Sequence, residues 1–218
     1  MSDQSATVEQ VLPQAPSPKR VSTHVVCITG FLQRHGSPYS GIFGIWRKLL
    51  GHADAVRFLP HLMFWNSRFR DVADTILTFR NGCDLRVVII GYSWGAGYGA
   101  MKLAEQLRRR GVTVDAMVLC DPVYRSRLFA TRWLALVGEL PISGWRPRIR
   151  VPDNVSRVMY WRQTMAMPRG HQLVAADPEV TKIDDRGLLD ADHVNVDNHP
   201  TFVNAAVEVA LEYRPPPE

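Results

Sequence analysis

Lysine and cysteine are scarce in this sequence of 218 residues. Only four of its 26 basic residues are lysines, and 21 acidic residues leave a net charge of +5. A charge this small for the length does not predict a nucleic-acid partner, which usually binds a strongly basic surface. Three cysteines, Cys27, Cys83 and Cys120, fit neither a disulfide framework nor the spacing of zinc ligands. We therefore expect a reducing, cytoplasmic compartment.

Long hydrophobic runs are also missing. The first twenty residues contain no apolar stretch that could form a signal-peptide core, and nothing later reaches the roughly 18 apolar residues of a membrane span. Residues 1–20 are rich in Pro, Ser and Gln, which predicts a disordered N-terminal tail, and 214–218 form a shorter Pro-rich tail. The remaining chain, 21–213, has the length of a single domain.

Between the tails, short apolar runs alternate with amphipathic segments. Strands are expected at 24–30, 55–59 (the weakest), 86–90, 114–120 and 155–161. Helical spacing of apolar residues is found at 69–77, after a cap at Asn66 or Ser67, at 96–107, closed by Gly111, and at 202–211. This alternation predicts an α/β fold: a three-layer, doubly wound, mostly parallel sheet of about five or six strands with helices on both faces.

One short motif carries most of the chemical information. Gly91-Tyr92-Ser93-Trp94-Gly95 matches G-x-S-x-G between an apolar strand and a helix, where the serine would lie on a sharp turn. Gly91 and Gly95 would give that turn the room it needs. Two other interpretations are a glycine-rich turn with an incidental serine, and a phosphate loop. The phosphate loop is disfavoured, because the segment has neither the lysine of a P-loop nor the spacing G-x-G-x-x-G.

A serine nucleophile needs a base, and usually an acid that orients the base. With an early Gly loop, the Ser93 elbow, an Asp after the next strand and a late His, the chain resembles the α/β-hydrolase superfamily, in a compact form without a cap domain. The resemblance implies a serine esterase or lipase with Ser93 as nucleophile and no metal or other cofactor. Its substrate would be a small-molecule ester or another acyl compound.

The acid and the base are chosen by position along the chain. Asp121 directly follows the strand 114–120, at the carboxyl edge that also holds Ser93, and is similar to the acid position of pancreatic-type lipases. Its other interpretation is an Asp that caps its own loop. The late loop before the last helix resembles the family's catalytic histidine loop and aligns His193 with the base. His199 and His171 are the alternatives.

The resemblance also implies an oxyanion hole made by two backbone N–H groups. Trp94, after the nucleophile, would supply one, and Phe31, after the first strand, the other, with Leu32 or Gln33 as substitutes. The apolar segment 128–145 follows Asp121. It is expected to be an amphipathic helix on the sheet or, alternatively, a flap that binds an acyl chain or transiently contacts a lipid surface.

Two further functions stay open at this stage. A thioesterase would use the same triad, and a catalytically silent binding module could keep the fold without the chemistry. Such modules usually lose one of the three residues, whereas this sequence offers a candidate for each: Ser93, Asp121 and His193.

Overall fold

The computed structural model describes residues 21–31, 33, 40–54, 57–80, 82–123, 148–163, 165 and 168–213. The two expected tails, 1–20 and 214–218, and the apolar segment 128–145 lie outside these residues. In the part of the chain that is described, no helix is long and apolar enough to cross a membrane.

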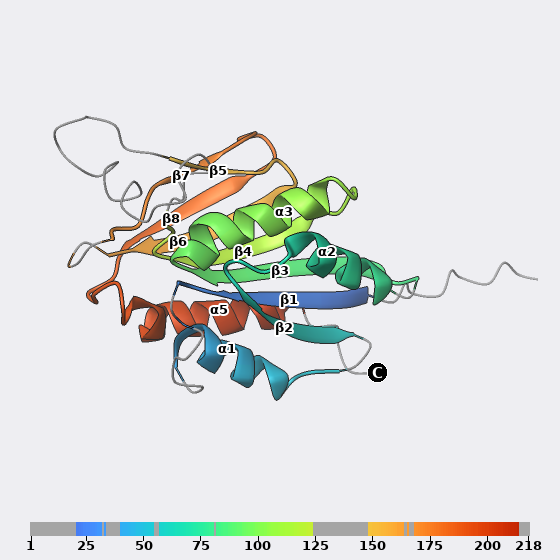
Figure 1. Ribbon diagram of the computed structural model, residues 1–218, viewed down its shortest axis with the longest axis horizontal. Coiled ribbons are helices and arrows are strands. Elements are labelled where there is room, and N and C mark those ends of the chain that lie inside the picture. The colour runs from blue at the N-terminus through green and yellow to red at the C-terminus, as the bar shows by residue number, and fades with distance from the viewer. Residues whose placement is uncertain are drawn as a thin grey trace, which may run out of the picture.

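Six parallel strands form the central sheet (Figure 1). In spatial order they are β2 (Phe58–Phe64), β1 (Val21–Thr29), β3 (Asp84–Tyr92), β4 (Val114–Cys120), β6 (Val155–Arg162) and β8 (Lys182–Leu188). The chain runs from β1 outward to β2 and then returns to place β3 on the other side of β1, so the strand order reverses there. Ligands of open parallel sheets bind beyond the carboxyl ends of the strands at such a reversal. Gly30, after β1, and Ser93, after β3, both lie at this place.

Helices cover both faces of the sheet, as Figure 1 shows. One face carries α2 (Phe69–Thr78) and α3 (Ala100–Arg108), and the other carries α1 (Gly41–Leu50) and α5 (Pro200–Glu212). The period-two geometry of a strand explains the division. In β1, Val26 and Ile28 join the core under α2 and α3, whereas Val25 and Cys27 join the core under α1 and α5. The predicted three-layer, doubly wound α/β fold is confirmed.

A smaller sheet lies outside the central one. It consists of β5 (Ile149–Val151) and β7 (Leu173–Ala175), which pair in parallel. Three residues per strand are too few to give a recognisable pattern of alternation, so the sequence did not predict this pair.

The boundaries of the weakest predicted strand were wrong. Instead of 55–59, the strand β2 begins at Phe58 and runs through Pro60 to Phe64. Proline usually ends a strand because it has no N–H to donate to a neighbour. β2 is the outermost strand on its side of the described sheet, and an edge strand tolerates that loss.

The starts of two helices also differ from the prediction. The residue before α2 is Arg68, and the Ser67 hydroxyl accepts a hydrogen bond from the Phe64 N–H (3.0 Å) instead of capping the helix. The helix expected from residue 96 begins as a π-helical turn, Gly95–Gly99, which continues into α3. Pattern analysis cannot anticipate this turn, because π-helical turns have no periodicity of their own in a five-residue segment.

Candidate active site

Ser93 lies on a strained turn between β3 and the π-helical turn. Its φ of 53° is in the left-handed region, which a residue with a Cβ adopts only at a cost of about 1–3 kcal/mol. Three backbone hydrogen bonds hold it there. The Ser93 N–H donates to the Cys120 carbonyl (3.0 Å), and the Ser93 carbonyl accepts from Gly97 (2.8 Å) and Val123 (3.1 Å). The nucleophile candidate is therefore fixed by the neighbouring strand β4 as well as by its own helix.

The two glycines of the motif make this turn possible. A Cβ at Gly95 would lie 2.4 Å from the carbonyl oxygen of Ile28, and one at Gly91 would lie 3.0 Å from the Cα of Ala96. The Gly95 distance is shorter than real Cβ contacts, so only glycine lets the turn pass this close to β1, and the Gly91 distance is at the tight end of the contacts that real Cβ atoms make. Gly91 and Gly95 thus give the turn the room that the motif predicts.

A continuous chain of hydrogen bonds connects Ser93, His193 and Asp121. The Ser93 Oγ lies 3.0 Å from the His193 Nε2, and the His193 Nδ1 lies 2.5 Å from the Asp121 Oδ2. With the proton on Nδ1, the imidazole donates to the carboxylate and its Nε2 accepts from the serine hydroxyl. Residues 72 to 100 positions apart in the sequence are thereby brought within direct contact at the carboxyl edge of the sheet.

Asp121 is completely buried and is held from several sides. It too has a positive φ, 45°, directly after β4, and its N–H donates to the Trp161 carbonyl (2.8 Å). Its Oδ1 accepts from the Gln163 N–H (3.2 Å) and its Oδ2 from the Gln163 Nε2 (3.0 Å). A buried carboxylate without such donors would be strongly destabilising. Gln163, which the sequence analysis did not identify, therefore holds the Asp121 carboxylate in place.

The loop that carries His193 is anchored to β3. The Tyr92 hydroxyl donates to the His193 carbonyl, and the two rings lie 5.3 Å apart. Burial raises the pKa of Tyr92, and the neighbouring carboxylates raise it further, so its hydroxyl stays protonated and remains a donor. Because Tyr92 directly precedes Ser93, the end of β3 positions both the Ser93 hydroxyl and the loop that carries His193.

The other two histidine candidates occupy different places. His199 is the N-cap of α5, where its Nδ1 accepts from the Thr201 N–H (3.3 Å). His171 is buried, its N–H donates to the Pro122 carbonyl (2.7 Å), and burial lowers its pKa. Of the three, His193 is the one whose ring lies within hydrogen-bond distance of the Ser93 hydroxyl.

Phe31 and Trp94 lie on the side of Ser93 that faces β1. Their rings are 4.7 Å apart, and a Cβ at Gly30, next to Phe31, would lie 3.0 Å from the Ser93 Cβ. The loop after β1 therefore passes directly beside the nucleophile, where an oxyanion donor has to be. The roles of the two N–H groups remain predictions. Of the substitutes, Leu32 lies outside the described residues, and Gln33 directs its side chain back to Gly30 (2.8 Å).

Aromatic rings extend from this side of the nucleophile across the end of the sheet. Trp65, after β2, lies 4.9 Å from Trp94, 5.9 Å from Phe31 and 6.4 Å from Tyr98, measured between ring centroids. These four residues form an apolar surface beside the elbow, of the kind that binds the apolar part of a ligand.

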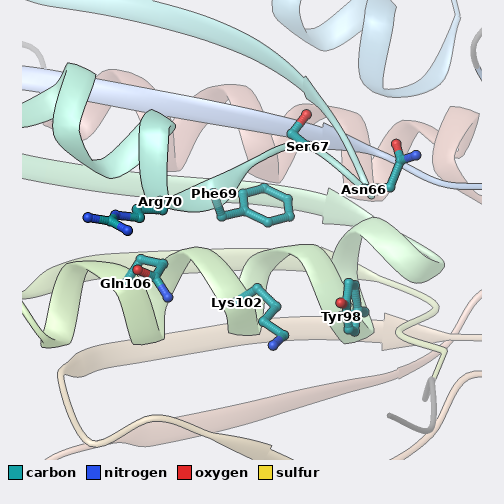
Figure 2. Close-up of a pocket in the computed structure, with 7 residues that line it drawn as sticks. All are labelled: Asn66, Ser67, Phe69, Arg70, Tyr98, Lys102 and Gln106. Carbon is teal, nitrogen blue, oxygen red and sulfur yellow. The ribbon is translucent and has the colours of Figure 1, made fainter. Parts of the chain in front are cut away.

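Tyr98 also belongs to a pocket of about 320 Å³ between α2 and α3. Figure 2 shows Tyr98 on the π-helical turn and Lys102 and Gln106 on α3, facing Phe69 and Arg70 on α2. Asn66 and Ser67 lie at one end of the pocket. Ser93, Asp121 and His193 are not among the described residues that line it. The pocket is therefore a feature separate from the hydrogen-bonded chain of Ser93, His193 and Asp121.

The described residues contain no cluster of three or more His, Cys, Asp or Glu that could hold a metal ion. The three cysteines are buried, and burial raises the pKa of the Cys27 and Cys120 thiols, so both stay in the unreactive thiol form at neutral pH.

Comparison with known proteins gives matches among solved structures. No family model matches the chain, and no curated protein matches it. The RedJ thioesterase of the prodiginine pathway in Streptomyces coelicolor is 14% identical, with 97% of each chain covered and a TM-score of 0.47. ClbQ from the colibactin NRPS/PKS pathway is 12% identical, with 88% of this chain and 97% of that chain covered and a TM-score of 0.45. A hyperthermophilic esterase from Pyrobaculum calidifontis is 14% identical over 91% of this chain and 78% of its own, with a TM-score of 0.40.

The molecule's own features assign its fold. A parallel sheet whose order reverses between β1 and β3 carries a serine on a strand-to-helix elbow, and Ser93, Asp121 and His193 follow one another in that order along the chain. The protein therefore has a fold of the α/β-hydrolase type.

Proposed function

We propose that this protein is a serine hydrolase that cleaves a carboxylic ester of a small molecule through an acyl-enzyme on Ser93. The observation that carries the proposal is the hydrogen-bonded chain from the Ser93 Oγ through His193 to Asp121, placed where the strand order reverses. A silent binding module would not need three buried or half-buried polar groups aligned in this way, because each costs free energy to desolvate.

Acylation uses each group once. The Ser93 Oγ attacks the ester carbonyl carbon while its proton passes to the His193 Nε2. The carbonyl oxygen becomes an oxyanion, which the N–H groups of Trp94 and Phe31 stabilise. The ester C–O bond then breaks, and His193 returns the proton to the leaving alcohol. Asp121 stays ionised throughout and stabilises the imidazolium.

Deacylation repeats the sequence with water. The His193 Nε2 removes a proton from a water molecule, whose oxygen attacks the acyl carbon. The second tetrahedral intermediate then collapses, the carboxylic acid leaves, and the proton returns to the Ser93 Oγ. One water is consumed per ester, and no group outside the chain is required.

The same steps cleave a thioester, with a thiol as the leaving group. The two reactions differ only at the leaving atom. Hydrolysis rates for p-nitrophenyl esters of increasing acyl length, measured beside an acyl-thioester of equal length, decide between them.

The direct test of the proposal is labelling by a fluorophosphonate, which reacts with an activated serine. We expect labelling of the wild-type protein and none of Ser93→Ala. Ser156→Ala, which changes an exposed serine on β6, is the matched control and should label like the wild type. Folded wild-type protein that neither labels nor hydrolyses any ester of the panel would contradict the proposal and support a binding module.

We also propose a cytoplasmic location. Three buried cysteines without a disulfide are compatible with a reducing compartment, in which free thiols persist. Fractionation of cells that express the protein, followed by immunodetection, tests this independently of the enzymatic assay.

A further inference from the structure

Asp197 is a buried carboxylate that the triad does not use. It lies in a 3-10 turn, η3 (Val196–Asn198), four residues after His193 on the loop that leads to α5, and its side chain is fully buried. Burial raises its pKa, and the hydrogen bonds it accepts work in the opposite direction. A buried acid of this kind needs a reason, because an apolar residue would be less costly at the same position.

Its closest partner comes from the loop after β1. The Gln33 Nε2 donates to the Asp197 Oδ2 at 2.6 Å, which is short for a bond from an amide to a carboxylate. The other end of the same amide, the Gln33 Oε1, accepts from the Gly30 N–H at 2.8 Å. One side chain thus joins the start of the loop after β1 to the histidine-bearing loop, 164 positions later in the sequence.

Asp197 is fixed in turn by α1. Its Oδ2 accepts from the Ile42 N–H (3.3 Å), and the neighbouring Asn198 Oδ1 accepts from the Gly41 N–H (2.5 Å). The preceding residue, Ser40, makes no capping bond with its side chain, so η3 provides the acceptors that the first turn of α1 needs. Figure 1 shows α1 and α5 on the same face of the sheet, which places this turn between them.

The end of β1 lies against the nucleophile. A Cβ at Gly30 would approach the Tyr92 ring to 2.7 Å and the Ser93 Cβ to 3.0 Å, so a small displacement of Gly30 changes the surroundings of Ser93. Phe31 follows Gly30 directly, and its N–H is the proposed second oxyanion donor. Rings on one side and Gln33 on the other hold this dipeptide.

We infer that Gln33 and Asp197 are positioning residues that hold the loop after β1, and with it the Phe31 N–H, in place for the developing oxyanion. The inference rests on the proposed function. One loop then supplies both the base, through His193, and the anchor of the oxyanion hole, through Asp197, so the two halves of the site are fixed relative to each other.

Three single variants test it: Gln33→Ala, Asp197→Asn and Asn198→Ala. Asn198→Ala is the matched control, because Asn198 accepts from α1 in the same turn, and its Nδ2 donates at 3.5 Å to the Asp197 Oδ1, which is not the oxygen that Gln33 binds. On a p-nitrophenyl ester we expect Gln33→Ala to lower kcat about 10- to 100-fold with KM changed less than about threefold. Asp197→Asn should lower kcat by a similar factor. Asn198→Ala should keep kcat within about threefold of the wild type, even if its Tm falls as much as that of Asp197→Asn.

A charge exchange gives the sharpest readout. Gln33→Glu alone places two carboxylates against each other. It should be slower than Gln33→Ala and Asp197→Asn, and more so as the pH rises from 5 to 8. The double variant Gln33→Glu/Asp197→Asn restores one amide and one carboxylate, with Gly30 still able to donate to residue 33. We expect it to recover at least about tenfold in kcat over Gln33→Glu.

The outcomes separate the two proposals. If the wild type is active, Ser93→Ala is inactive, and either Gln33→Ala keeps its kcat or the double variant recovers nothing, the positioning role is wrong while the proposed function stands. Equal losses of kcat in Gln33→Ala and Asn198→Ala would also overturn it, because they would reflect packing of the turn alone. A wild type that is neither labelled nor active refutes both.

Discussion

Asp121 and Asp197 are both fully buried, and each binds the side-chain amide of a glutamine. Their surroundings differ in one respect. Asp121 shares its Oδ2 between Gln163 and the ring of His193, whereas the bonds of Asp197 go to Gln33 and to the first turn of α1. The first carboxylate acts on a group that is proposed to gain a charge during the reaction, and the second on a loop that stays neutral.

The difference predicts that the two carboxylates contribute to turnover on different scales. An acid beside an imidazole fixes its tautomer and stabilises its positive charge, and both effects are needed in every transition state. An acid that holds a loop affects the rate only through the position of one donor. Equal burial therefore does not mean equal importance for turnover, and substitution of each acid by its amide measures the gap.

The largest effect is expected for Asp121→Asn. The amide keeps the shape of the side chain, but it cannot accept from the His193 Nδ1–H as a carboxylate does and favours the wrong tautomer. We expect kcat to fall about 10⁴-fold, far beyond the loss in Asp197→Asn. Steady-state kinetics on one ester, with near-UV circular dichroism to check the fold, measure both. Equal losses of kcat in Asp121→Asn and Asp197→Asn would contradict the different roles proposed for the two carboxylates.

Gly41→Ala disturbs the contacts of Asp197 from the side of α1. Gly41 has a φ of +54°, and an added Cβ would lie 1.9 Å from the Asp197 Oδ2. Backbone strain and the displacement of a buried carboxylate together should lower the free energy of unfolding by at least about 3 kcal/mol. Urea denaturation provides the measurement.

Gly111→Ala is the control for that experiment. Gly111 also has a positive φ, +68°, but nothing lies within 4 Å of an added Cβ. Only the backbone strain remains, and we expect a loss of about 1 kcal/mol. If the two alanine variants were equally stable, the contact with Asp197 would not matter.

Two stacked histidines away from the site, His24 and His61, allow the same comparison for buried basic side chains. The rings of His24 in β1 and His61 in β2 stack 5.1 Å apart, with the His24 Nδ1 2.9 Å from the His61 Nε2. Burial, and to a lesser extent the charge of His61, lowers the pKa of His24 from 6.5 to about 4. Burial also lowers the pKa of His61. Because the unfolded chain takes up protons first, stability is fully present above pH 6.5 and is lost as the pH falls towards about 4.

We expect His24→Asn to flatten this acid loss. The wild type should lose up to about 3 kcal/mol across that window through His24, and the variant much less of it. Urea unfolding at pH 7, 6, 5 and 4.5 gives the slopes. His52→Asn, in the turn after α1, should keep the slope of the wild type, and a slope unchanged in His24→Asn would assign the acid sensitivity to other groups.

Sequence patterns predicted the strands that are rich in apolar residues. β1, β3, β4 and β6 each contain several buried apolar residues, and their prediction was confirmed with small shifts in their ends. β8 was missed, because Lys182–Leu188 has charged residues on an exposed edge and no apolar alternation. α1 was missed as well, although Ile42, Ile45 and Leu49 have helical spacing and are fully buried.

The residues of the candidate site were predictable where a local motif or the order along the chain identified them. Ser93 was identifiable from a motif of five residues, and Asp121 and His193 from their order relative to it. Gln33 and Gln163 belong to no motif, because each acts on a carboxylate 164 or 42 positions away, and such partners are set only by the folded chain. The roles of the oxyanion donors stay predictions.

The strained backbone at Ser93 lowers the stability of the fold at the residue that the proposed reaction uses as its nucleophile. A glycine would relax at a φ of 53°, so the residue that the proposed reaction needs most is also one that the fold would prefer to lose. Selection for thermal resistance alone would drive this position towards glycine and produce a sturdier, inert protein. The serine at this position therefore serves the proposed reaction and not the stability of the fold.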